Sequence, residues 1–129
     1  MPVAAQLTAL VVDDQSSIRQ LVRQGLLQIG FGEVRDAFDG EDGLKKIIEK
    51  PNSLVISDFN MPNLDGLAFL RAMRTYEPTR NTAFIMLTGR ADRDLVARAV
   101  QFGVNNYLVK PFTVATLKEK IEAVFGTLT

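Results

Sequence analysis

The stretch from Ser53 to Gly66, SLVISDFNMPNLDG, decides the fold of this chain. Its first part, Leu54 to Ile56, is a short unbroken apolar run, which is typical of a strand buried on both faces of a parallel sheet. Asp58 follows this run, and turn-forming residues from Asn60 to Gly66 then lead the chain into a helix. An Asp at such a position commonly starts a turn, but in an open α/β sheet the carboxyl end of a strand is also where ligands bind.

Outward from this stretch, apolar strands and amphipathic helices alternate along the chain. We expect strands at Leu7 to Val12, Glu33 to Ala37, Leu54 to Ser57, Ala83 to Leu87 and Asn106 to Val109. We expect helices from Gln15 to Gly30, Glu41 to Lys50, Gly66 to Thr75, Asp92 to Phe102 and Thr113 to Phe125. Apolar residues recur in these helices at spacings of three and four, and Leu21, Ile48 and Val100 are counted among them.

This alternation predicts an α/β fold, a five-stranded parallel sheet with helices on both faces. The turn after Val12 is Asp13 to Ser17, which lacks the Gly-x-Gly-x-x-Gly of a dinucleotide-binding fold, and the chain has no P-loop motif. We therefore expect the flavodoxin-like strand order 2-1-3-4-5. Residues 1–129 are expected to form one domain, with no output domain attached.

Composition excludes several classes of function. The chain has 15 basic and 15 acidic residues, so general attraction to DNA or to an anionic membrane is not expected. It has no Cys and no His, which excludes thiolate chemistry, Ser-His-Asp triads and zinc sites with those ligands. No leader-like N-terminus and no membrane-length apolar run is visible, so we expect a cytoplasmic protein without membrane insertion.

Polar residues end four of the expected strands, and the order 2-1-3-4-5 brings them to one edge of the sheet. They are Asp13 with Asp14, Asp58, Thr88 and Lys110. Carboxylates this close repel one another and require a cation, and oxygen ligands suit Mg²⁺. An Asp beside Mg²⁺, a hydroxyl and an ammonium can also accept a phosphoryl group. Singly, Asp14 could instead be a helix cap, Thr88 a strand end and Lys110 a solvated charge.

Four motifs resemble the receiver domains of two-component response regulators, and among these the single-domain chemotaxis regulators. The motifs are VVDDQ (11–15), SDFNMPNLDG (57–66), LTGR (87–90) and YLVKPF (107–112), and the match covers essentially the whole chain. The resemblance implies that Asp58 is the phosphoacceptor, with a histidine kinase or phosphotransfer protein as the donor. Such a protein would be a switch with at most self-phosphorylation from small donors and self-dephosphorylation.

The same resemblance assigns roles to the neighbouring residues. Asp14 would bind Mg²⁺ directly, Asp13 largely through water, and Asn60 through its backbone carbonyl. Thr88 and Lys110 would bind the phosphoryl group, and the Lys110–Pro111 bond would be cis. Tyr107 occupies the place of the family's aromatic switch, in which Thr88 moves toward the phosphoryl group and the tyrosine ring fills the space it leaves.

The expected output surface is formed by the fourth helix, the fifth strand and the fifth helix. Its candidate partner-binding residues are Arg90, Arg98, Gln101, Tyr107 and Lys118. The target would be a protein, with the flagellar motor switch as one candidate. Phe59 and Arg90 depart from the chemotaxis pattern, which expects Trp and Glu there, and the arginines of the fourth helix replace a lysine cluster, so the partner surface is expected to differ.

Two other functions remain open from the sequence. A haloacid-dehalogenase-like phosphatase also uses an Asp nucleophile, Mg²⁺, Thr or Ser and Lys, but it wants a second Asp two residues after the nucleophile, and Asn60 stands there. A phosphorylation-independent adaptor, or a receiver whose arginines bind an anion such as a nucleotide, is the other alternative.

Overall fold

The computed structural model describes residues 2–89 and 93–129. It contains five strands, β1 (Thr8–Val12), β2 (Glu33–Ala37), β3 (Leu54–Asp58), β4 (Ala83–Thr88) and β5 (Asn106–Val109). Its α-helices are α1 (Ser16–Ile29), α2 (Gly40–Glu49), α3 (Gly66–Thr75), α4 (Arg93–Gln101) and α5 (Val114–Phe125). Short 3₁₀ helices lie at Ala4–Gln6 and Glu77–Thr79.

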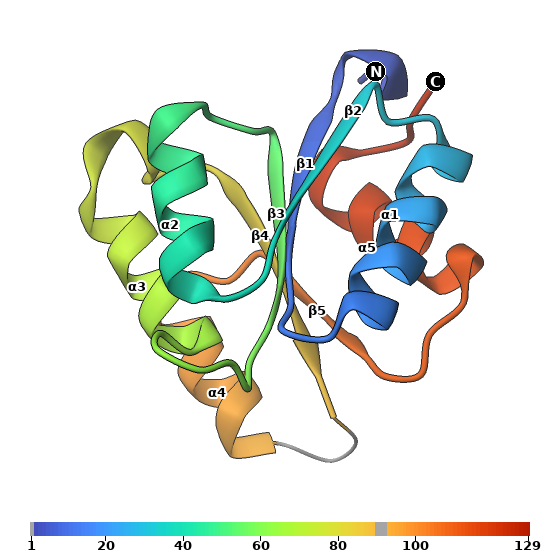
Figure 1. The fold of residues 1–129 in the computed structure, drawn as a ribbon. Helices are drawn as coiled ribbons and strands as arrows, with labels where there is room; N and C mark the ends of the chain where they lie inside the picture. The colour runs from blue at the N-terminus through green and yellow to red at the C-terminus, as the bar shows by residue number, and fades with distance from the viewer. Residues whose placement is uncertain (1, 90–92) are drawn as a thin grey trace.

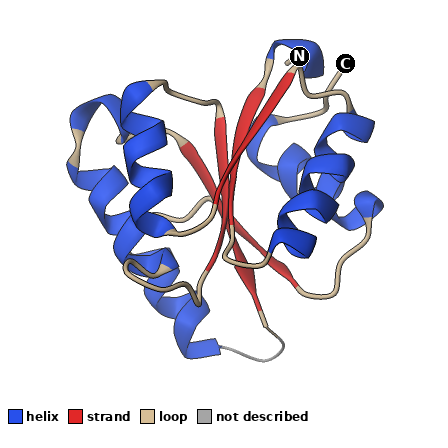
Figure 2. Cartoon of the chain, viewed as in Figure 1, coloured by secondary structure: helices blue, strands red, loops and turns tan. Residues whose placement is uncertain are grey.

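The five strands form one parallel sheet in the order β2-β1-β3-β4-β5. This confirms the flavodoxin-like order expected from the sequence. The sheet lies between two helical layers, with α1 and α5 on one face and α2, α3 and α4 on the other (Figures 1 and 2). Since all strands run in the same direction, their carboxyl ends share one edge of the sheet, and β1, β3 and β4 are neighbours there.

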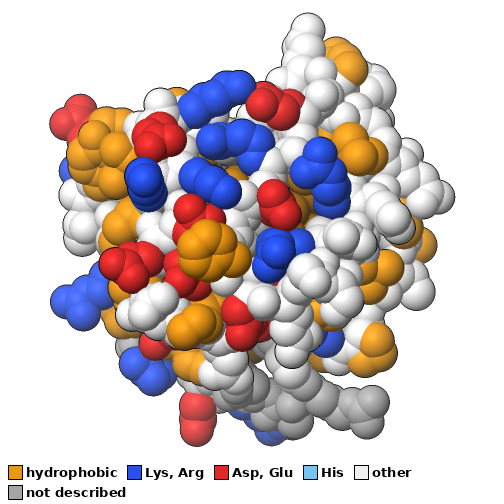
Figure 3. Space-filling model, in the orientation of Figure 1, with side chains coloured by type: hydrophobic (Ala, Val, Ile, Leu, Met, Phe, Trp, Pro, Cys, Tyr) orange, Lys and Arg blue, Asp and Glu red, His pale blue; other side chains and the backbone are white. Residues whose placement is uncertain are grey.

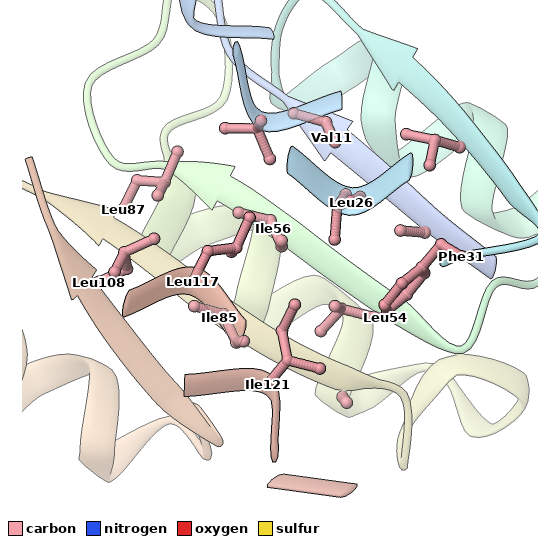
Figure 4. Packing of buried hydrophobic residues seen from close by; sticks show 14 residues of the cluster. Val11, Leu26, Phe31, Leu54, Ile56, Ile85, Leu87, Leu108, Leu117 and Ile121 are labelled. Carbon is pink, nitrogen blue, oxygen red and sulfur yellow. The ribbon is translucent and has the colours of Figure 1, made fainter. Parts of the chain in front are cut away.

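Each face of the sheet has its own hydrophobic core. Under α1 and α5, residues from the strands pack against Val22, Leu26, Leu117 and Ile121 (Figure 4). Under α2, α3 and α4, the core includes Phe69 of α3, which meets Phe84 of β4 edge to face at 5.6 Å between ring centroids. Each fully buried aliphatic or aromatic side chain stabilises the fold by about 1.5–3 kcal/mol, so these two layers fix the strand ends in place.

Three helical positions that the sequence pattern counted as apolar are solvent-exposed instead. Leu21, Ile48 and Val100 are 49%, 47% and 63% exposed. The expectation that Ile48 lies on the inner face of its helix was wrong, and Leu21 and Val100 follow the apolar spacing of their helices without being buried. In α2 the buried positions are Gly40, Gly43 and Ile47, which recur at spacings of three and four. Glycine carries no apolar side chain, so the sequence pattern does not reveal that it occupies an inner face.

The guanidinium group of Arg74 links several segments of the chain near the amino-terminal end of β4. Arg74 of α3 donates to the carbonyls of Gly103 and Arg80 and to Asn105 Oδ1, at 2.9–3.1 Å. Asn105 Oδ1 also accepts from the backbone N–H of Phe84 at 2.8 Å. Burial lowers the pKa of Arg74, as expected for a guanidinium partly withdrawn from water. The network therefore joins α3, the α4–β5 turn and β4.

The two ends of the chain lie side by side at the opposite edge of the sheet from the strand carboxyl ends (Figure 1). Thr129 donates its N–H to the carbonyl of Pro2 at 2.9 Å, and its own carbonyl accepts from Ala4 N–H at 3.1 Å. Among residues 2–89 and 93–129, no helix is long and apolar enough to cross a bilayer.

Surface charge is mixed in sign, as the equal numbers of acidic and basic residues suggest. Figure 3 shows basic and acidic side chains interspersed over the face that carries α2 and β2. Two ion pairs lie in these elements and their neighbours, Lys46 with Asp42 at 3.2 Å and Lys50 with Glu33 at 3.0 Å.

Candidate functional site

Three carboxylates meet at the carboxyl ends of β1 and β3. Asp13 and Asp14 follow β1, and Asp58 is the last residue of β3. One carboxylate oxygen from each lies within 4.8 Å of the others. Asp13 is fully buried and Asp58 is 8% exposed, whereas Asp14 faces solvent. The strand order therefore brings together the acidic residues that the sequence placed at this edge.

Lys110 supplies the cation at this edge. It follows β5, and its Nζ donates to Asp58 Oδ1 at 2.9 Å and lies 3.8 Å from Asp13 Oδ2. Its backbone N–H donates to the carbonyl of Thr88 at 2.8 Å, which ties the end of β5 to the end of β4. The interpretation of Lys110 as only a solvated charge is therefore wrong. The Lys110–Pro111 peptide bond is cis, as expected.

Asp13 is held in an arrangement that disfavours its charge. Burial is the largest cause and raises the pKa of this carboxyl from 3.8 to about 6, with the nearby Asp58 and Asp14 charges adding to the increase. The Gln15 N–H that donates to Oδ1 at 2.9 Å and the Lys110 ammonium act in the opposite direction. Oδ2 is buried and has no hydrogen-bond partner within the described part of the chain.

These groups fit a hard divalent cation. The donors are carboxylate oxygens from three residues, the buried Asp13 Oδ2 accepts no hydrogen bond from the described residues, and open space lies beside them. Mg²⁺ prefers oxygen ligands and keeps several waters, which such an open site allows.

The space beside the carboxylates is a cavity of about 350 Å³. It is lined by Asp14, Gln15, Asp58, Phe59, Asn60, Gly89, Leu95 and Lys110. The structure thus brings four predicted site residues, Asp14, Asp58, Asn60 and Lys110, around one opening. The N-cap of α1 is Gln15, so Asp14 does not cap that helix.

Thr88 and Tyr107 line a second cavity, between α4 and β5. Its volume is also about 350 Å³, and its other lining residues are Gly89, Arg93, Val96, Ala97 and Val109. Thr88 ends β4 and is 2% exposed, while Tyr107 is 37% exposed with Lys120 Nζ 4.9 Å from its ring centroid. Gly89 lines both cavities, so the Thr88 strand end lies between the carboxylate cluster and the tyrosine.

The remaining predicted residues lie on the surface. Arg98 and Gln101 of α4 and Lys118 of α5 are solvent-exposed, as expected. The prediction for Arg90 lies outside the described residues. These three partner-binding candidates are therefore accessible to another protein.

Two close contacts near the site were not expected from the sequence. Arg19 of α1 donates from Nη1 to the backbone carbonyl of Asp13 at 2.8 Å, and its Nε pairs with Asp36 at 3.1 Å. Gly66 begins α3 so close to the strand that a Cβ there would lie 2.5 Å from the carbonyl oxygen of Asp58. The Arg19 contacts join separate segments of the chain, and the Gly66 contact depends on the absence of a side chain. Local sequence patterns reveal neither.

Comparison with known proteins agrees with this geometry. Residues 9–122 match the family model described as "Response regulator receiver domain". The chain is 52% identical over 128 residues to the probable chemotaxis protein CheY of Rhizobium etli, covering 99% of each chain. It is 39% identical over 119 residues to chemotaxis protein CheY-3 of Vibrio cholerae, covering 92% of each.

Solved structures give the same result. The chemotaxis response regulator CheY4 of Vibrio cholerae superposes with a TM-score of 0.86 at 34% identity, covering 92% of this chain and 98% of that one. A response regulator from Chloroflexus aurantiacus, described as putative in its structure report, gives a TM-score of 0.88 at 28% identity, covering 98% and 100%.

Proposed function

The chain belongs to the response regulator receiver family, and we propose that it accepts a phosphoryl group on Asp58 and signals through phosphorylation-dependent protein binding. Members of this family are signalling switches, and they take phosphate from histidine kinases and act on downstream targets. The proposal adds the accepting residue and the route of the signal through this chain.

One observation carries the proposal, the pairing of Asp58 with Lys110 at 2.9 Å beside two further carboxylates. The Asp58 carboxylate faces a cavity open to a phosphodonor, and its free oxygen lone pairs can attack phosphorus. The new bond joins Asp58 to phosphorus while the bond from phosphorus to the donor breaks, and the donor keeps that electron pair. Lys110, which donates to Asp58, would then pair with the negative oxygens of the transferred group.

Asp14 and Asp58 would hold Mg²⁺ directly, with the backbone carbonyl of Asn60, and Asp13 would contact it largely through water. When bound, Mg²⁺ neutralises carboxylate and phosphoryl charge at this edge. Arg19 donates to the backbone carbonyl of Asp13 and the Gln15 N–H donates to its Oδ1, so both contacts help to hold this carboxylate beside the other acidic groups.

For the switch, we propose that Thr88 moves toward the phosphoryl group and Tyr107 enters the space between α4 and β5. Three observations support this step: both residues line one cavity, Tyr107 is partly exposed, and Gly89 connects that cavity to the carboxylates. Movement of the tyrosine would change the surface of α4, β5 and α5. The exposed Arg98, Gln101 and Lys118, with Tyr107 itself and the predicted Arg90, would contact the partner.

The names of the relatives suggest where this switch acts. The Rhizobium etli and Vibrio cholerae proteins are named as chemotaxis proteins, so we propose a chemotaxis pathway in the cytoplasm. The phosphodonor would be a histidine kinase or a phosphotransfer protein, and the target a protein such as the flagellar motor switch. Residues 1–129 would act as a single receiver domain.

Phosphorylation of the chain by a small acyl phosphate in the presence of Mg²⁺ tests the proposal. Intact mass should rise by one phosphoryl group, and Asp58→Ala should abolish the increase. Asp65→Asn is the matched control, because it removes an exposed carboxylate from the same β3–α3 loop, keeps the cap of α3 and should leave labelling unchanged. An adduct that persists in Asp58→Ala would contradict the assignment.

A further inference from the structure

The loop that follows Asp58 is fastened to the start of α2. Asp39 is the N-cap of α2 and is 3% exposed, and its two carboxylate oxygens bind different partners. Oδ1 accepts from the backbone N–H of Asp42 at 2.8 Å, which is the capping bond. Oδ2 accepts from the side-chain amide of Asn63, in the β3–α3 loop, at 2.7 Å. Helix capping needs only the first of these bonds.

Beside this hydrogen bond, the backbone of α2 also lies very close to the backbone of the β3–α3 loop. A Cβ added to Gly40 would lie 2.1 Å from the carbonyl oxygen of Leu64, so α2 and the loop pack at a distance that no side chain at Gly40 permits. Asn63 holds a left-handed φ of 69°, a conformation that Asn tolerates better than most residues. Asn63 and Leu64 therefore lie against the start of α2 through a side-chain bond and a backbone contact.

The other end of the loop is fastened to the strand. Gly66 N–H donates to the carbonyl of Phe59 at 2.9 Å, and Gly66 itself lies against the Asp58 carbonyl. Asn60 lies between these two attachments and lines the cavity with Asp14 and Asp58. The position of its carbonyl therefore depends on both ends of the loop, and the outer end depends on Asp39.

We propose that Asp39, through Asn63, is a positioning residue for the metal site, holding the loop so that the Asn60 carbonyl faces the carboxylates. This role rests on the proposed function, since it supposes that Mg²⁺ binds there. Asp39 lies 19 residues before Asp58 in the chain (58 − 39) and is absent from the acidic cluster, so it acts through the loop rather than by contact with the ion. Residues that support metal ligands typically change affinity about 10- to 100-fold when replaced.

Calorimetric titration of the unphosphorylated full chain with Mg²⁺ alone tests the role. Asp39→Ser keeps a capping oxygen for α2 but cannot reach Asn63 in the same way. Asn63→Gly removes the amide, keeps the left-handed backbone accessible and changes no charge. Each variant should bind Mg²⁺ about 10-fold more weakly, and the double variant should be no weaker than either single one, because both break the same bond.

Two controls separate positioning from charge and from stability. Asp65→Asn removes one negative charge from the same loop, keeps the cap of α3 and should change the affinity by less than about 2-fold. The swap Asp39→Asn with Asn63→Asp restores a cap and a donor–acceptor pair and should recover most of the lost affinity. Thermal unfolding of each variant without Mg²⁺ reports any loss of fold, and amide chemical shifts of residues 59–64 report movement of the loop.

The results that overturn the inference are distinct. Wild-type affinity in both Asp39→Ser and Asn63→Gly would remove the positioning role and leave the metal site standing. Weakening in Asp65→Asn equal to that in Asp39→Ser would assign the effect to charge alone. A wild-type chain that binds no Mg²⁺ would overturn the metal site of the proposed function, and this role with it.

Discussion

Lys110 Nζ lies 2.9 Å from Asp58 Oδ1, at a strand end where three carboxylates converge. The lysine follows β5 and the aspartate ends β3, so β4 lies between the two strands that carry them. The ammonium therefore reaches across a neighbouring strand to offset acidic charge that the sheet topology brings together. Mg²⁺ and Lys110 should consequently compete electrostatically for the same group of oxygens.

Replacing Lys110 with Met should reveal this competition. Without metal, the variant loses a hydrogen bond between charged groups and should be less stable by about 1–3 kcal/mol. Removing a unit charge a few ångströms from a divalent ion should also tighten Mg²⁺ binding, by roughly 5-fold for about 1 kcal/mol. Thermal unfolding in chelator and in Mg²⁺, with calorimetry, measures both effects. Lys118→Met, an exposed lysine on α5, should change neither; weaker Mg²⁺ binding in Lys110→Met would contradict the competition.

Mg²⁺ affinity should depend on pH through Asp13. Burial raises the pKa of this carboxyl from 3.8 to about 6 in the metal-free fold, so it carries a proton below about pH 6 and must lose it to face the ion charged. Affinity should therefore fall as the pH drops through 6. Titrations from pH 5 to about pH 8 measure the step. Asp13→Asn should bind more weakly at every pH and lack the step near 6, whereas a step retained in this variant would assign it to another group.

In the absence of Mg²⁺, the raised pKa of Asp13 should also make the free energy of unfolding depend on pH. Because the folded-state pKa of Asp13 lies above its ordinary value, the folded chain holds this proton more tightly than the unfolded chain does. The contribution is fully present below about pH 4 and is lost as the pH rises to about 6. Denaturant unfolding in chelator, compared with Asp13→Asn across this window, isolates it. Equal pH slopes in the two proteins would contradict the raised pKa.

Gly66→Ala should destabilise the chain by overpacking. The new methyl would lie 2.5 Å from the Asp58 carbonyl oxygen and 2.9 Å from Met86 Sδ, so backbone must shift, at a cost of about 1–3 kcal/mol. Denaturant unfolding measures the change in free energy. Gly89→Ala is the matched control, because a Cβ there has no heavy atom of the described residues within 4 Å outside its chain neighbours. Equal stability of the two variants would show that the contact at Gly66 relaxes freely.

Ala97→Leu should block the proposed switch while leaving phosphorylation in place. Ala97 lines the cavity that Thr88 and Tyr107 share, and a longer side chain there would occupy the space the tyrosine must enter. Nuclear magnetic resonance of the Tyr107 ring, with and without a phosphoryl mimic, measures its movement. Val100→Leu adds a methylene at an exposed position of the same helix and should leave the ring shift intact. A Tyr107 response of wild-type size in Ala97→Leu would contradict this route.

Arg74→Ala should cost about 2–4 kcal/mol, because it leaves the Gly103 and Arg80 carbonyls and Asn105 Oδ1 short of a charged donor. Arg74→Lys should recover little, since an ammonium cannot reproduce the planar fork. Thermal unfolding measures both. Arg71→Ala, on the same helix and in contact with the Phe102 ring at 5.7 Å, should cost only about 0.5–1 kcal/mol. If Arg71→Ala and Arg74→Ala lowered the stability by similar amounts, the Arg74 network would contribute no more than an ordinary surface contact.

The sequence predicted β1, β3 and β4 well because each is a short, mainly apolar run closed by a polar residue. β2 and β5 have the predicted bounds, and β3 and β4 each extend by one residue, to Asp58 and Thr88. The acidic cluster was predictable for the same reason: parallel strands bring their carboxyl ends to one edge, so chain position alone placed Asp13, Asp14 and Asp58 together.

What the sequence could not predict depends on contacts between distant segments. The sequence assigned no role to Asp39, and its bond to Asn63 exists only because α2 and the β3–α3 loop meet in three dimensions. Arg74 looked like an ordinary charge on a helix, yet its partners include Gly103 and Asn105, about 30 residues later. The exposure of Leu21, Ile48 and Val100 was missed for a related reason. Periodicity alone does not say how much of a helix its neighbours cover.

The hydrogen-bonded pairing of the two chain ends has a practical consequence for engineering. Thr129 bonds to Pro2 and Ala4 at the sheet edge remote from the carboxylates, so a short peptide could join them without crossing the cavities. A circular permutant with that junction, reopened at the exposed Pro51 in the connection between α2 and β3, would keep all five strands intact. A fluorescent protein fused beside Pro2 or Thr129 would likewise project away from the α4–β5 cavity, leaving the proposed partner surface uncovered.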